Sequence, residues 1–192
     1  CILKILTDSL GTLVISCGIL FAAVICLILY CGAARRKRRD KTEAKIEIFL
    51  NLGFFSLLVA VWTLVQCGFV QFLIPDGRTL YFVDYFSLFL FPVPFNFLLY
   101  DICKSRYHKV ALVFSSLYLA NMAVDVLLQC TGIIDMSRLL SVTHVIMVAN
   151  AVYTVAIILY EARKKENDVA KKFQYPMYVA MGFGMAEMFL YY

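Results

Sequence analysis

Six long apolar runs, separated by short charged connectors, constrain this 192-residue chain more than any other feature. A helix needs about 20 mostly apolar residues to cross a hydrocarbon core of about 30 Å, and each run meets that length. Strands of a membrane barrel would alternate polar and apolar side chains, and no segment does so. We therefore predict an all-α membrane protein, an antiparallel bundle of six transmembrane helices over residues 9–34, 46–74, 79–103, 110–133, 139–161 and 173–192.

The composition favours the same class, because 62% of the residues are hydrophobic and only 16% are charged. Soluble domains carry about 25% charged residues. The short connectors leave no room for a soluble domain, so residues 1–192 are predicted to form one transmembrane sensor or input domain. Since the sequence begins at Cys1 and ends at Tyr192 inside an apolar run, we expect it to be a piece of a longer chain. Cys67 and Cys130 have the positions to pair, but the cysteine spacing does not predict a disulfide framework.

The basic residues predict the direction of the spans. Fifteen of the 18 Lys and Arg residues lie in the first, third and fifth connectors, and only Lys4, Arg78 and Arg138 lie on the other side. Short loops with such an excess face the cytoplasm, so the amino end is expected outside a multi-pass plasma-membrane protein. The cluster at 35–39 directly follows a span and has no aromatic platform. We therefore expect it to contact anionic lipid headgroups of the bilayer and not nucleic acid.

Polar residues inside the spans need a reason, because an ionisable side chain at a helix centre costs about 2.5–3.5 kcal/mol. Several of them fall at a similar depth, toward the predicted outer surface, on five different helices. We interpret them as a candidate ligand-binding or signal-sensing layer. The alternative is that they only join helices through hydrogen bonds of about 0.6 kcal/mol each, and that Asp84 only caps the third helix. The candidate residues are Gln66, Asp84, Asp125, Gln129, His144 and Glu187, and Asn121 shares a helix stripe with Asp125 and Gln129.

Two prolines interrupt the third predicted span. Pro92 and Pro94 remove backbone hydrogen bonds and kink a helix, and Asn96 is a candidate partner for the freed carbonyl groups. We predict a conformational hinge at Pro92, Pro94 and Asn96, with a fixed kink as the alternative. Gly18 with Ala22, and Ala180 with Gly184, are small-residue pairs that permit close helix contact.

Motifs of enzymes are missing from the sequence. It contains no HExxH, no GxSxG, no glycine-rich phosphate loop and no Cys/His ligand set, so we predict no catalytic residue, no metal site and no cofactor in residues 1–192.

Several hydrophobic patterns resemble a known family. Residues 50–66 with 68–73, residues 85–95 and residues 127–133, with Asp135 and the pair Thr143-His144, are similar to bacterial seven-transmembrane receptors with diverse intracellular signalling modules. Residues 85–95 and 127–133, with Asp135 and Thr143-His144, are similar to the Firmicutes variant that precedes GGDEF diguanylate cyclase domains. The matching positions, whose roles the resemblance does not assign, are Trp62, Gln66, Pro92, Pro94, Gly132 and His144.

This resemblance implies a sensory input domain that passes an extracytoplasmic or membrane signal to a cytoplasmic output enzyme in the same chain. It also implies a homodimer, since cyclase output needs two active domains. The main alternative function is a small-molecule transporter or part of one, which would require inverted repeats and broken helices at the midplane. A eukaryotic G-protein-coupled receptor is less favoured, because no Asp-Arg-Tyr follows the third span.

Overall fold

The computed structural model describes residues 2–40, 46–103, 107–164 and 167–190, apart from the side chains of residues 2–8, 37–40, 164, 183 and 187–190. Within this described part, the chain is helical or in short turns and contains no strand. The chain divides into two compact units, Cys1–Leu98 and Leu99–Tyr192, and each unit is described by itself.

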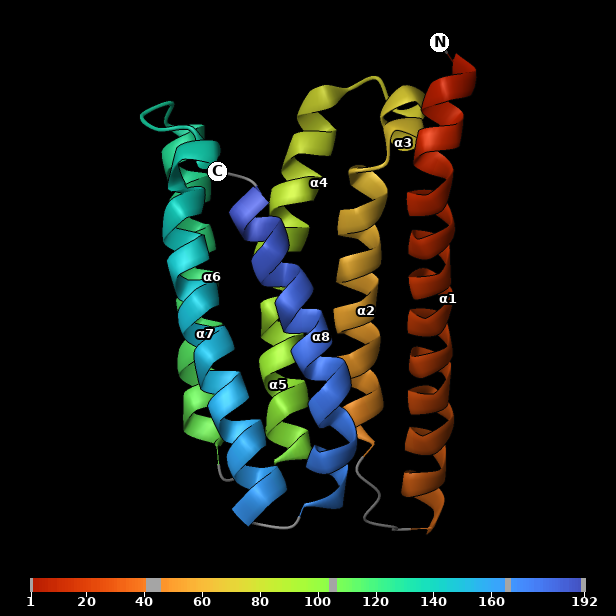
Figure 1. The fold of residues 1–192 in the computed structure, drawn as a ribbon, viewed down its shortest axis with the longest axis vertical. Helices are drawn as coiled ribbons and strands as arrows, with labels where there is room; N and C mark the ends of the chain where they lie inside the picture. The colour runs from red at the N-terminus through yellow and green to blue at the C-terminus, as the bar shows by residue number, and fades with distance from the viewer. Residues whose placement is uncertain (1, 41–45, 104–106, 165–166, 191–192) are drawn as a thin grey trace. The chain divides into compact units, whose positions relative to one another are not determined.

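The first unit contains four helices and the start of a fifth (Figure 1). The long helix α1 packs along α2, while the short α3 packs against both of them and α4 packs on α2. These elements are α1 (Ile2–Asp40), α2 (Glu47–Val65), α3 (Gly68–Leu73), α4 (Gly77–Leu90) and α5 (Pro92–Ile102), and the boundary between the units falls within α5.

Close packing between α1 and α2 depends on Gly53. A Cβ atom at this position would lie 2.9 Å from Cγ of Leu27, so any larger residue would require the Leu27 side chain or the helix to shift. The buried Ser16 hydroxyl donates a 2.9 Å hydrogen bond to Thr63 Oγ1 and also links α1 to α2. Among the residues that the structure describes, none has an atom within 4 Å of a Cβ built at Gly18, so no close helix contact uses that position there.

The second unit is built from α6 (His108–Cys130), α7 (Met136–Lys164) and α8 (Asp168–Leu190). Consecutive helices pack on each other, α6 on α7 and α7 on α8. The α6–α7 turn contains Gly132 at φ 69°, a left-handed conformation that glycine adopts without strain. At the start of α8, the Asn167 side chain accepts hydrogen bonds from the N–H groups of Val169 and Ala170, and it donates to the carbonyl of Ile102.

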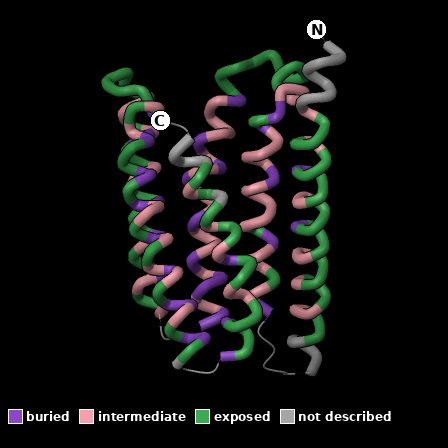
Figure 2. Tube along the Cα trace, in the orientation of Figure 1, coloured by how far each residue is buried: buried purple, intermediate pink, exposed green. Residues whose placement is uncertain are grey.

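Figure 2 shows that buried and exposed positions alternate along the helices. On several helices apolar side chains are exposed and polar ones are buried, which is the reverse of a soluble protein. On α7, Val145 and Val152 are 70% and 66% exposed, while Thr143 is fully buried. Five segments of the described chain are long and apolar enough to cross a membrane: Ser9–Arg36, Glu47–Val65, Gly77–Ile102, His108–Cys130 and Met136–Arg163. Helix α8 is not among them, so the sixth span stays a prediction, as does the direction of all the spans.

Two of the predicted spans are interrupted. The span predicted over 46–74 ends as a helix at Val65, because Cys67 takes an extended conformation (ψ 120°) before the separate helix α3. The span predicted over 79–103 is divided at Phe91, directly before Pro92. Both prolines of α5 lie in its first turn, the part of a helix that tolerates the missing N–H group.

Candidate functional site

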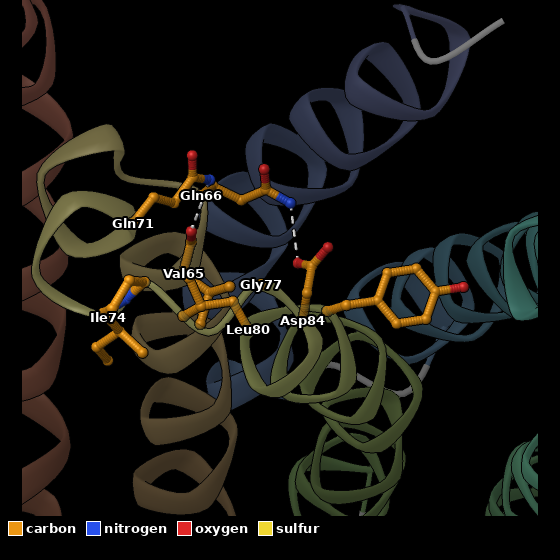
Figure 3. Close-up of a pocket in the computed structure, with 9 residues that line it drawn as sticks. Val65, Gln66, Gln71, Ile74, Gly77, Leu80 and Asp84 are labelled. Carbon is orange, nitrogen blue, oxygen red and sulfur yellow. Dashed lines mark hydrogen bonds between the residues drawn. The ribbon is translucent and has the colours of Figure 1, made fainter.

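A pocket of about 280 Å³ lies where α2, α3 and α4 meet (Figure 3). Apolar side chains and the loop before α4 form part of its wall, and Gln66, Gln71, Tyr81 and Asp84 provide its polar groups. The pocket exists because the chain leaves α2 at Gln66, forms the short α3, and returns as α4. A single uninterrupted helix over 46–74 would not produce this open pocket.

Asp84 is held by side chains from α2. Gln66 Nε2 donates a 2.8 Å hydrogen bond to Asp84 Oδ1 (Figure 3). The Trp62 side chain is a second donor to the same carboxylate. Gln71 Nε2 instead donates to the backbone carbonyl of Val65, 3.2 Å away, which fastens α3 to the end of α2. The structure thus brings together Gln66 and Asp84, two of the residues predicted for the polar layer.

Asp84 does not cap α4, and the suggestion that it does is wrong. The cap is Asp76, whose side chain accepts a 3.1 Å hydrogen bond from the backbone N–H of Arg78. Hydrogen bonds from the Thr79 hydroxyl and from that N–H hold the pKa of Asp76 below its ordinary value of 3.8. Asp84 lies about two turns further along the helix, where it faces Gln66.

Aromatic rings extend from the carboxylate to the helix interruption at Phe91. The Trp62 ring, which contacts Asp84, lies 6.2 Å from the ring of Phe91. Phe55 of α2 packs on both Phe91 and Phe95, at 6.0 and 5.5 Å. The pocket is therefore connected by side-chain contacts to the residue that precedes Pro92.

The predicted hinge residues lie at this interruption. Pro92 begins α5, Pro94 follows in its first turn, and the Phe95 N–H reaches the carbonyl of Phe91 at 3.4 Å, a long hydrogen bond. Asn96 is buried, but its Nδ2 has no hydrogen-bond partner among the described residues. The expectation that Asn96 supplies donors to the freed carbonyl groups is therefore wrong.

A second polar cluster joins α6 to α7. Asn121 Nδ2 donates to Asp125 Oδ2 at 2.9 Å and to Thr143 Oγ1 at 2.8 Å. Asp125 is only 1% exposed, so this cluster places a carboxyl group inside the helix pair. Interhelical hydrogen bonds of this kind average about 0.6 kcal/mol in membrane proteins.

The other members of the predicted layer have different surroundings. Gln129 Oε1 accepts a 2.8 Å hydrogen bond from the N–H of Met136, so Gln129 stabilises the start of α7 across the turn. His144 is buried on α7, next to Thr143. The side chain of Glu187 lies outside the described residues. A single layer across both units therefore stays a prediction, and each unit by itself contains a polar cluster, Gln66 with Asp84 in the first and Asn121 with Asp125 and Thr143 in the second.

Sequence reasoning missed a longer polar stripe on α7. Thr143, Asn150, Thr154 and Glu161 are all buried and repeat at intervals of seven, four and seven residues. This spacing returns to the same helix face, and it was the signal available in the sequence. Tyr107, which precedes α6, donates a 3.3 Å hydrogen bond to Glu161 Oε1.

We also searched the described residues for a metal site and for a disulfide bond. Within the described residues, no group of three or more His, Cys, Asp or Glu side chains lies close enough to hold a metal ion. Cys67 and Cys130, the two cysteines considered for pairing, are both free thiols. Comparison of the chain with protein-family models, with curated proteins and with solved structures gives no match in any of the three.

Proposed function

We propose that this chain is a multi-pass membrane sensory domain that detects a ligand or membrane signal at the Gln66–Asp84 pocket. The observation that carries the proposal is the pair itself: a carboxylate on α4, held by Gln66 and Trp62 of α2, lines a pocket. An ionisable group in an apolar helix is a candidate functional site with a named partner. The pocket also involves α3, so an occupant would contact three helices at once.

The contacts of Trp62 support a route for the signal. A ligand shifts a conformational equilibrium only when it binds the two states unequally. Any occupant that competes for Asp84 changes the environment of Trp62, whose ring packs on Phe91 at the interruption before Pro92. We propose that the change is passed in this way to α5, with Pro92 and Pro94 as the hinge.

The orientation and the output are also proposals. The bias of Lys and Arg toward alternate connectors supports six spans with the amino end outside, which puts the pocket at the outer surface. Alkaline phosphatase fused after Gly77 is then expected to be active, and the same enzyme fused after His108 inactive. The resemblance to bacterial seven-transmembrane receptors supports a plasma-membrane homodimer with a cytoplasmic diguanylate cyclase as its output.

The test uses the complete reading frame, expressed in bacterial cells, with cyclic di-GMP as the readout. Asp84→Asn keeps the side-chain shape and one oxygen acceptor, whereas Asp84→Leu removes both oxygen acceptors. We therefore expect a larger change in cyclic di-GMP for Asp84→Leu than for Asp84→Asn. Asp135→Asn is the matched control, because it neutralises a loop carboxylate outside the pocket. Unchanged cyclic di-GMP in both Asp84 variants, at equal membrane levels, would refute the sensing role of the pocket.

A transporter, or part of one, is the second candidate. The observation that favours it is that the membrane-length segment Gly77–Ile102 is divided at Phe91, and transporters bind substrates at broken helices. The rest of the reading frame distinguishes the two functions. A seventh span followed by an enzyme domain supports the receptor, while an inverted repeat of these helices supports the transporter.

A further inference from the structure

The polar stripe on α7 extends along most of the helix. From Thr143 to Glu161 it covers 18 residue steps, which is about 27 Å of helix. This length approaches the thickness of a hydrocarbon core, about 30 Å. The proposed sensing site in the other unit does not involve this stripe.

Direct hydrogen bonds close the two ends of the stripe. At one end, Asn121 bonds to Asp125 and Thr143. At the other end, Tyr107 bonds to Glu161. These polar ends therefore have partners supplied by the protein.

Between the ends, the polar groups on α6 and α7 are buried but incompletely bonded. The Tyr118 hydroxyl is hydrogen-bonded to the Asn150 side chain, yet Asn150 Oδ1 has no partner among the described residues. The same holds for Ser115 Oγ and Thr154 Oγ1, and both of these residues are also buried.

These groups lie on one stretch of the α6–α7 seam. The rings of Phe114 and Tyr153 pack 5.4 Å apart. This contact and the Tyr118–Asn150 bond place Ser115 and Thr154 within about one turn of each other along the antiparallel pair. The Tyr153 hydroxyl is a further buried group without a partner in the described part of the chain.

We propose that the α6–α7 seam binds water between Ser115 of α6 and the Asn150 and Thr154 side chains of α7. Buried hydroxyl and amide groups in proteins are bonded either to protein or to ordered water. Water is the ligand that fits here, because it donates to Asn150 Oδ1 and exchanges hydrogen bonds with the hydroxyls of Ser115 and Thr154. An apolar occupant would leave all three groups unbonded.

The test is hydroxyl-radical labelling by X-ray radiolysis of the complete protein in lipid nanodiscs, because radicals formed from bound water label adjacent side chains. Tyr118 and Phe89 are both 1% exposed, and only Tyr118 borders the seam. We expect Tyr118 to be labelled at least fivefold faster than Phe89. Equal rates for the two residues would overturn the proposal without the use of any variant.

Variants locate the water. The double variant Ser115→Ala with Thr154→Val removes two hydroxyls and leaves the Tyr118–Asn150 bond intact, and it is expected to slow Tyr118 labelling at least threefold. The control Val152→Thr adds a hydroxyl to an exposed position of the same helix and is expected to leave the rate unchanged. Wild-type labelling of Tyr118 in a folded double variant would contradict the proposed bound water.

Discussion

The Asn121–Thr143 hydrogen bond is a direct polar link between α6 and α7, so its removal is a sharp test of the structure of the second unit. We consider a double-mutant cycle of Asn121→Ala and Thr143→Val. Thr143→Val keeps the side-chain shape and removes only the hydroxyl. Asn121→Ala also removes the bond to Asp125, but this loss occurs in the single and in the double variant and cancels from the coupling energy.

The expected coupling follows from the geometry. The Asn121 Nδ2 to Thr143 Oγ1 distance is 2.8 Å, and Thr143 is fully buried. Measured interhelical hydrogen bonds in membranes average about 0.6 kcal/mol and reach about 1.7 kcal/mol. We expect a coupling of about 0.6–1.7 kcal/mol, with a larger total cost of about 1–3 kcal/mol for Asn121→Ala because a buried carboxyl group loses its donor.

The assay is the free energy of unfolding in bicelles, measured by steric trapping with tags on α6 and α8. A cycle of Thr143→Val with Asn167→Ala is the control, because Asn167 lies beside Glu161 at the far end of α7. Its two changes should add within about 0.5 kcal/mol. A coupling of zero between Asn121 and Thr143 would show that the α6–α7 register described above is incorrect.

Three further predictions concern packing, backbone conformation and charge. Gly53→Leu should lower the melting temperature in detergent, because its Cβ would meet Leu27 at 2.9 Å and overpacking costs about 1–3 kcal/mol. Gly132→Ala should destabilise by about 1 kcal/mol because φ is 69°, whereas Gly132→Asn should be milder, and equal denaturation curves for both would refute this reason. Asp76 has a lowered pKa in the folded protein, so its stabilisation of α4 is present above pH 3.8 and is lost as the pH falls further. When the free energy of unfolding is measured as a function of pH, it should therefore fall less at acid pH in Asp76→Asn than in wild type.

Much of the class of this fold follows from the sequence alone. Apolar runs with few charges specify helices that are long enough to cross a membrane, because backbone groups in lipid must be satisfied within each segment. Five such helices are present in the described chain. The sequence also identified Gln66, Asp84 and Asp125 as polar residues that need a partner, since each lies in an apolar run.

The partners of those residues were decided only by tertiary structure. Hydropathy did not reveal that the chain breaks at Cys67, and this break forms the pocket in which Gln66 meets Asp84. Hydropathy also did not distinguish the roles of Asp125, which pairs with Asn121, and Gln129, which accepts a hydrogen bond at the start of α7. The physical reason is that hydropathy depends on each residue in its own segment, whereas a hydrogen bond between helices depends on their register and rotation. These are set by packing contacts such as Gly53 against Leu27.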